Sequence, residues 1–175
     1  SGTALSLGAY TLTLTGGGNL LNLNSITLGN ASSVFNITGT NTISGPIALN
    51  NGSIDVDNSS TLSGAVTLGG AASVDVASGQ TLSYSGTALS LEANTLTLSG
   101  GGNLSNTNSI TLDNASSILN FTGSSTVSGP IVLNSGTLDI DEDSAITGAL
   151  TLGGAATIDV ASGKTLSYSG TAVSL

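Results

Sequence analysis

Apolar and small polar residues alternate in short runs that recur about every twenty residues along the chain. The first run of each group reads apolar–polar–apolar, as in Leu5-Ser6-Leu7 and Ile26-Thr27-Leu28. A second alternation follows, as in Leu12-Thr13-Leu14, and a third, weaker apolar position such as Leu20 closes the group. Because an alternation of period two places one face inside and the other outside, each run predicts a short β-strand.

Four such groups make up each stretch of 84 residues, with Gly, Asn, Ser and Asp as turn formers between the runs. In the first stretch the groups span residues 3–24, 25–45, 46–64 and 65–86, which gives lengths of 22, 21, 19 and 22 residues. A lone group cannot bury its apolar face, so neighbouring groups must stack and share one core. The pattern predicts an all-β fold, a right-handed parallel β-helix of about eight turns of 19–22 residues with three short strands per turn.

The four-group stretch is itself repeated. Residues 1–84 and 85–168 are identical at 58 of 84 aligned positions, and residues 169–175 match the opening of both. We therefore expect a single β-solenoid segment over 1–175, with repeat 1 at 1–84, repeat 2 at 85–168 and the start of a third repeat at 169–175. The chain has no Met at its start and no polar capping turn at either end. We expect it to be part of a longer array, whose ends pair with flanking repeats or self-associate end to end or laterally.

Composition excludes several function classes. The chain has ten acidic residues, one base (Lys164) and a net charge of −9, which argues against binding to nucleic acid or anionic membranes. It contains no His and no Cys, which excludes Ser-His-Asp and Cys-His catalysis and thiolate metal sites. No apolar run is long enough to insert into a membrane. We expect no enzyme activity, no catalytic residue and no bound cofactor.

Acidic residues are the remaining candidate ligands. The densest acidic run consists of Asp139, Asp141, Glu142 and Asp143, and its three Asp residues are candidates for a calcium site. Half of these four acids are absent from the aligned positions of repeat 1. A solvated strand and turn is the simpler interpretation, and a catalytic acid/base pair is a third. The Gly-Gly-x-Gly-x-Asp nonapeptide of calcium-binding β-rolls is missing.

Stacking of turns should also bring acids together. We expect Asp55 to lie beside Asp75 and Asp139 beside Asp159 on adjacent turns, where the like charges repel and a divalent ion would relieve the repulsion. The same outward column begins with Thr13 and continues with an Asn. A threonine ladder of the kind that binds ice is therefore broken at once.

The turns resemble those of a known class of proteins. Ser25-Ile26-Thr27-Leu28 and Ala65-Val66-Thr67-Leu68-Gly69-Gly70, each followed by a second alternation and a closing Ile or Leu, are similar to the β-helical passengers of bacterial autotransporters, filamentous-haemagglutinin-like exoproteins and giant repetitive surface adhesins. The resemblance covers the whole chain and implies a shaft on or outside a bacterial cell. It transfers no binding residue, because the adhesive parts of such proteins lie elsewhere.

Two functions from different classes follow. The first is a structural shaft or stalk segment of a giant tandem-repeat extracellular or cell-surface protein, which supplies length, stiffness and protease resistance. The alternative is a carbohydrate-binding or carbohydrate-cleaving β-helix module, by analogy of fold. Such modules often use aromatic platforms. The five aromatic residues are Phe35, Phe121, Tyr10, Tyr84 and Tyr168. Phe35 and Phe121 are expected to point inward, which leaves little aromatic surface to stack on sugars.

Overall fold

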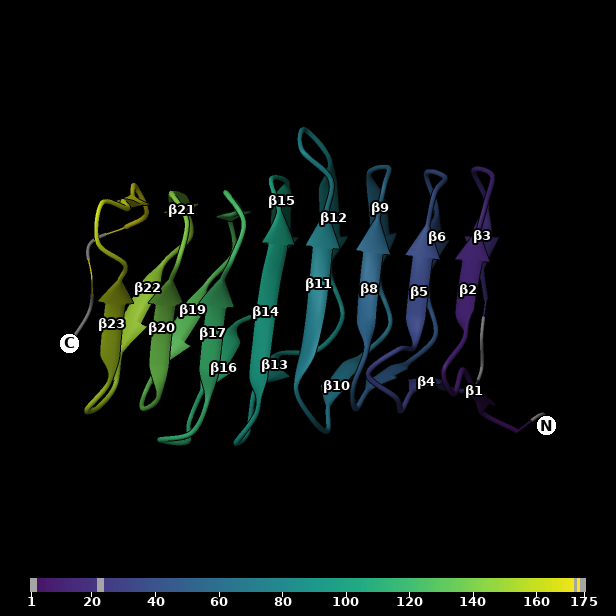
Figure 1. Cartoon of the computed structure of the whole chain (residues 1–175), viewed down its shortest axis with the longest axis horizontal. Coiled ribbons are helices and arrows are strands. Elements are labelled where there is room, and N and C mark those ends of the chain that lie inside the picture. The colour runs from purple at the N-terminus through teal and green to yellow at the C-terminus, as the bar shows by residue number, and fades with distance from the viewer. Residues whose placement is uncertain (1–2, 22–23, 172, 174–175) are drawn as a thin grey trace.

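The computed structural model describes residues 3–21, 24–171 and 173. The chain winds into a β-solenoid of about eight turns, and successive turns lie side by side along one axis from the N-terminus to the C-terminus (Figure 1). Each turn contributes three strands, and every strand pairing among the described residues is parallel. The predicted fold class, turn number and strand number are confirmed, while the right-handed sense of the coil stays a prediction.

The three strands of each turn build three faces. The first face is formed by two separate four-stranded sheets, which contain β1 (Leu5–Ser6), β4 (Ile26–Leu28), β7 (Ile47–Leu49) and β10 (Val66–Leu68), then β13 (Leu89–Ser90), β16 (Ile110–Leu112), β19 (Ile131–Leu133) and β22 (Leu150–Leu152).

The second and third faces are continuous eight-stranded sheets. The second contains β2 (Thr11–Leu14), β5 (Val34–Ile37), β8 (Ser53–Val56), β11 (Ala72–Val76), β14 (Thr95–Gly100), β17 (Ile118–Phe121), β20 (Thr137–Ile140) and β23 (Thr157–Val160). The third contains β3 (Asn19–Leu20), β6 (Thr42–Ile43), β9 (Ser60–Leu62), β12 (Thr81–Tyr84), β15 (Asn103–Asn106), β18 (Thr126–Val127), β21 (Ser144–Ile146) and β24 (Leu166–Tyr168).

The inward side chains form one core along the axis. Buried and half-buried residues alternate in the strands, as in β5 and β20. Phe35 and Phe121 are both fully buried, as the alternation predicts. They occupy neighbouring inward positions of the unit, since Phe35 aligns with Leu119 and Phe121 aligns with Ile37. The bulky ring therefore moves by two residues between the repeats while both copies still fill the core.

The junction between the two repeats has a register that the repeat pattern did not show. Within a repeat the second strands pair position for position, as Leu12 does with Phe35. At the junction β14 is shifted by two residues, so that Val74 pairs with Leu98 and Val76 with Gly100. An even shift keeps inward residues inward, so the core continues across the junction.

The first face is interrupted at the same place. β10 ends one four-stranded sheet and β13 begins the next, and no ladder joins them among the described residues. The hydroxyl of Tyr84 accepts a hydrogen bond from Val66 N–H at 3.1 Å and donates one to the carbonyl oxygen of Thr87 at 2.7 Å. A buried tyrosine thus bridges the gap between the two sheets.

Candidate functional site

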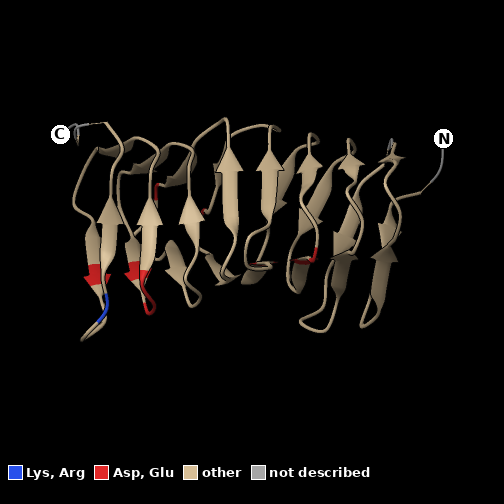
Figure 2. Cartoon of the chain, turned by 90° about the horizontal axis from the view of Figure 1, so that it is seen from above, with Lys and Arg blue, Asp and Glu red and all other residues tan. Residues whose placement is uncertain are grey.

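Half of the ten acidic residues lie in the last two turns, near the C-terminal end of the molecule, with Lys164 beside them (Figure 2). Asp139 lies on the outward side of β20 and pairs with Asp159 on β23, while Asp55 pairs with Asp75, as expected from the stacking of turns. Partial burial, then Asp141, then Asp159 raise the pKa of Asp139. The pKa of Asp55 is raised for the same reasons: chiefly by burial, then by the charge of Asp57 and then by that of Asp75. The stacked carboxylates are therefore sites of mild electrostatic repulsion.

Glu142 and Asp143, at the corner before β21, both contact residues of the next turn. Glu142 Oε2 lies 2.5 Å from Lys164 Nζ, and this hydrogen bond is the main cause that raises the pKa of Lys164. Asp143 Oδ1 accepts a hydrogen bond from the backbone N–H of Thr165 at 2.8 Å. In repeat 1 the aligned Ser59 accepts from Thr81 N–H at 3.0 Å, so both side chains do the same structural task.

The calcium candidates Asp139, Asp141 and Asp143 are consequently not brought together as one ligand set. Asp139 faces outward from a strand, whereas Asp143 is engaged at the corner. In the described part of the chain, no three acidic, His or Cys side chains gather in a way that could hold a metal ion.

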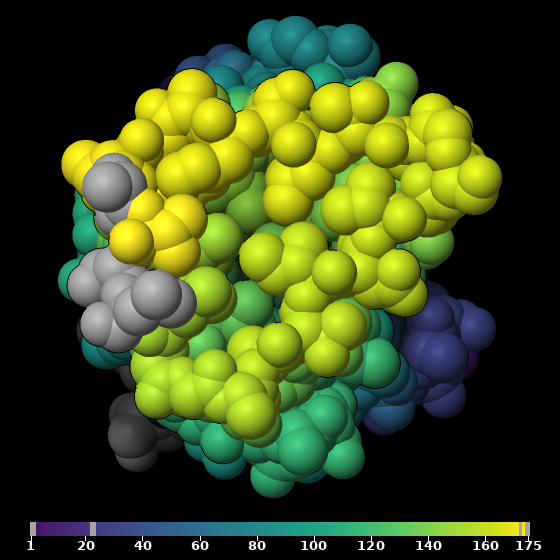
Figure 3. All heavy atoms as spheres, turned by 90° about the vertical axis from the view of Figure 1, so that its left-hand side faces the viewer, coloured from purple at the N-terminus to yellow at the C-terminus, as the bar shows by residue number. Residues whose placement is uncertain are grey.

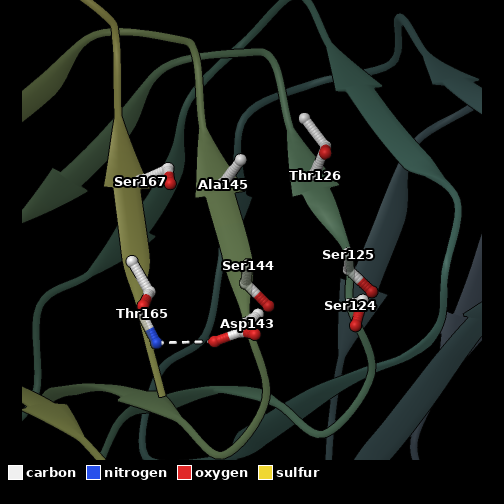
Figure 4. Close-up of a pocket in the computed structure, with 8 residues that line it drawn as sticks. All are labelled: Ser124, Ser125, Thr126, Asp143, Ser144, Ala145, Thr165 and Ser167. Atoms are coloured by element: carbon white, nitrogen blue, oxygen red, sulfur yellow. Dashed lines mark hydrogen bonds between the residues drawn. The ribbon is translucent and has the colours of Figure 1, made fainter. Parts of the chain in front are cut away.

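A hollow on the third face brings together a different set of side chains. It has a volume of about 350 Å³ and lies across β18, β21 and β24 (Figure 4). Hydroxyl groups dominate its lining, which consists of Ser124, Ser125, Thr126, Asp143, Ser144, Ala145, Thr165 and Ser167. The sheet exposes this row because outward positions of the third strands carry short side chains that cannot cover it.

The same hollow occurs in repeat 1. It has a volume of about 170 Å³, lies across β6, β9 and β12, and every lining residue is the counterpart, 84 positions earlier, of one in repeat 2: Thr40, Asn41, Thr42, Ser59, Ser60, Thr61, Thr81 and Ser83. The hollow is therefore a property of the repeat unit, and it recurs along one face at each repeat.

The floor of the hollow is polar and largely satisfied. Ser144 donates to the carbonyl oxygen of Gly123 at 3.0 Å, and Ser60 donates to that of Gly39 at 2.9 Å. Asn41 is 3% exposed, and its Nδ2 has no hydrogen-bond partner within the described ranges. The Asn41 amide is too buried to contact a ligand, and Ser125 replaces it in repeat 2. The hollow thus offers hydroxyl donors and acceptors, which suit a polyhydroxylated ligand.

Sequence reasoning did not find this hollow. Nothing in an alternating pattern separates a flat strand from a hollowed one. The available signal was the recurrence of Thr40-Asn41-Thr42 as Ser124-Ser125-Thr126, three consecutive small polar residues directly before an inward apolar residue in both repeats.

Aromatic residues play no part in the hollow. Phe35, Phe121 and Tyr84 are buried in the core, and Tyr10 is 77% exposed on the N-terminal turn.

Comparison with protein families, with characterised proteins and with solved structures finds no significant match to the chain. Among the described residues there is no helix long and apolar enough to cross a membrane.

Proposed function

We propose that this chain is a structural shaft segment of a tandem-repeat protein. The observation that carries the proposal is the junction between the repeats, where β11 pairs with β14 and β12 with β15 in parallel ladders. The second repeat therefore extends the first as one rod, and the two do not form separate domains joined by a linker. Repeated units that lengthen a common core gain stability from each neighbour, as in other solenoids.

The core gives such a rod its stiffness. At the junction Val74, Leu82, Leu96 and Leu104 are all at most 7% exposed, so the core continues from one repeat into the next. Backbone hydrogen bonds also cross the junction, for example from Asn103 N–H to the carbonyl oxygen of Gln80 at 2.9 Å. Bending the rod would break these ladders and open the packed core.

The surface composition suits an extracellular protein. With a single Lys, Lys164, and no Arg, the chain offers trypsin-like proteases one cleavage site, and that side chain is paired with Glu142. The net charge of −9 opposes non-specific aggregation. Together with the resemblance of the turns to bacterial β-helical exoproteins, these features support our proposal that the shaft belongs on or outside a bacterial cell.

The test is a length measurement. A protein in which residues 1–168 occur twice should be a rod about 38 Å longer than one in which they occur once, because eight added turns contribute about 4.8 Å each. Small-angle scattering and negative-stain electron microscopy measure this difference directly. Equal maximum dimensions, or particles that bend freely at each repeat boundary, would contradict the shaft.

The hydroxyl-lined hollow favours carbohydrate binding as a second function. A glycan array and a reducing-sugar assay separate binding from cleavage. Replacing Ser83 and Ser167 with Phe fills both hollows, whereas Thr67→Phe adds the same ring to an exposed position of β10 on another face. Glycan binding through the hollows would be lost in the first variant and kept in the second. Equal signals from both variants would remove the hollow as the site.

A further inference from the structure

A row of short, mostly polar side chains joins the two hydroxyl-lined hollows along the third face. Thr81 lines the hollow of repeat 1 and pairs with Asn103 on β15, which in turn pairs with Thr126 in the hollow of repeat 2. The row continues on adjacent strands to Ala145 and Ser167, and Figure 4 shows Thr126, Ala145 and Ser167 side by side. These five residues are called the track below. The track makes the two hollows parts of one continuous surface.

The track follows the long axis of the molecule. Seen along this axis, earlier turns lie behind the C-terminal turn, so residues paired across adjacent strands follow one another in depth (Figure 3). Adjacent strands are about 4.8 Å apart, so the steps from Thr81 through Asn103 to Thr126 cover about 10 Å, and the whole track to Ser167 covers about 19 Å. A ligand that reaches both hollows must therefore be an extended chain that lies along the axis.

The track does not connect equivalent residues of the two repeats. The counterpart of Thr126 in repeat 1 is Thr42, and the row of paired residues that starts at Thr42 leads to Ser105, two residues beyond Asn103. Equivalent rows are therefore displaced by two residues between the repeats, and the Thr126 row of repeat 2 lies in line with the Thr81 row of repeat 1. A ligand on the track would contact a different row in each hollow.

The polar atoms of the track are available to a ligand. The hydroxyl groups of Thr81, Thr126 and Ser167 make no hydrogen bond to any residue that the structure describes. Asn103 Oδ1 accepts a hydrogen bond from the Ser128 hydroxyl at 3.1 Å, and its Nδ2 has no partner in the same part of the chain. Hydroxyl groups both donate and accept, and the amide Nδ2 donates, so the track matches a ligand whose own groups do both, as sugar hydroxyls do.

Charge argues for a neutral ligand. Asp143 is the only charged residue among those that line the two hollows, and its Oδ1 already accepts a hydrogen bond from Thr165 N–H. Lys164, the only base in the chain, is paired with Glu142. The track therefore offers no cation to a carboxylate or sulfate group, and the net charge of −9 repels an anionic polymer.

We infer that the track binds a neutral, extended polysaccharide of the β-1,4-linked glucan type, which runs parallel to the axis and occupies both hollows. The inference rests on carbohydrate binding by the hollows, the second function proposed above, and names the ligand class. A β-1,4 linkage keeps a glucose chain straight, as the track requires, whereas an α-1,4 linkage curls it into a helix. Both chains carry hydroxyl groups of the same kind, so their shape distinguishes them.

The first test is the dependence of affinity on ligand length, measured by calorimetric titration of the intact chain. Cellobiose can occupy one hollow, whereas cellohexaose can reach both. Cellohexaose should bind about a hundredfold more tightly, because the second contact becomes intramolecular. Maltohexaose, the α-1,4-linked chain of the same length, should bind no more tightly than maltose. Equal affinities for cellobiose and cellohexaose, equal affinities for cellohexaose and maltohexaose, or no binding of either cello-oligosaccharide would each overturn the inference.

The second test obstructs the track between the hollows. Asn103→Ile places a branched apolar side chain there and replaces no residue that lines either hollow. It should lower the affinity for cellohexaose to that for cellobiose, and leave the affinity for cellobiose unchanged. Asn103→Ser keeps a short polar side chain and should retain the gain with length. Thr67→Ile, at an exposed position of β10 on another face, should bind like the parent chain. Circular dichroism checks that each variant is folded.

An Asn103→Ile variant that binds cellohexaose as tightly as the parent chain would also overturn the inference. This failure differs from failure of carbohydrate binding itself. Glycan-array signals that disappear when Ser83 and Ser167 are replaced with Phe, combined with no gain from cellobiose to cellohexaose, would keep the hollows as glycan sites and remove the track. An array without any signal would remove both. Neither result affects the proposed shaft, which the length measurement tests.

Discussion

The Tyr84 hydroxyl accepts the hydrogen bond from Val66 N–H that a backbone carbonyl oxygen of the next turn accepts elsewhere on the first face. Other first strands donate their leading N–H to the carbonyl oxygen of the next turn, as Ile47 does to Ala65 at 2.8 Å, but Val66 N–H donates to the Tyr84 hydroxyl at 3.1 Å. Tyr168 repeats the contact with Leu150 N–H at 3.2 Å. Each repeat therefore ends with the same tyrosine bridge, which satisfies a buried donor where the sheet is interrupted.

Replacing Tyr84 with Phe should destabilise the fold by about 1–3 kcal/mol, because the buried Val66 N–H and the Thr87 carbonyl oxygen lose their partner while the packing of the ring is kept. Urea denaturation followed by circular dichroism measures the loss. Tyr10→Phe removes a hydroxyl from a ring that is 77% exposed, and it should change stability by less than about 0.5 kcal/mol. Equal effects of the two substitutions would contradict the bridge.

Glu92 has a left-handed backbone conformation with φ of 50°, and its counterpart in repeat 1 is Gly8 with φ of 53°. Left-handed φ costs a residue with a Cβ about 1–2 kcal/mol, whereas glycine loses somewhat more entropy on folding. Glu92→Gly should therefore stabilise the chain by about 0.5–1 kcal/mol. The reciprocal Gly8→Glu should destabilise it by a similar amount, and opposite signs in thermal melts of the two variants are the check.

Glycines at the corner after the third strand allow adjacent turns to approach closely. A Cβ added to Gly64 would lie 2.0 Å from the carbonyl oxygen of Gly45, and the same clash recurs at Gly148. Because the obstacle is backbone, Gly64→Ala should cost about 3 kcal/mol or more. Gly18→Ala is the matched control, since an added Cβ there meets nothing within 4 Å. A Gly64→Ala variant as stable as this control would show that the turns can separate freely.

Asp139→Asn should stabilise the chain at neutral pH, because it removes a carboxylate whose folded pKa is raised by burial and by the neighbouring acids Asp141 and Asp159. A raised pKa means that the folded state holds the proton of Asp139 more tightly than the unfolded state does. The parent chain therefore loses stability as the pH rises from 3.8, the ordinary pKa of an Asp carboxyl group, through the higher pKa of the folded state.

The gain from Asp139→Asn should accordingly be full at pH 7 and vanish near pH 2, where the carboxyl group is protonated in both states. Thermal melts across this range measure it. Asp113→Asn removes one charge outside the stacked column and separates a local effect from a change in net charge. A gain that is independent of pH would rule out the electrostatic explanation.

Much of the fold was predictable because its pattern is local and repeated. The alternation identified Phe35 and Phe121 as core residues and placed Asp139 beside Asp159, and the pairing of β20 with β23 confirms this stacking. The hydroxyl-lined hollow was not predictable, since its depth depends on how far side chains of three neighbouring strands extend. The corner role of Asp143 was missed for a related reason: its partner, Thr165 N–H, lies one turn away.

The sequence by itself determined the number of turns, the three strands in each and the residues that face the core, because a period of two assigns faces without any knowledge of neighbours. Only the tertiary structure decided the two-residue shift between β11 and β14 and the tyrosine bridge where the first face is interrupted. An even shift leaves every residue on its own face, so the hydrophobic pattern permits both registers. The choice between them is made by the packing of whole turns against each other.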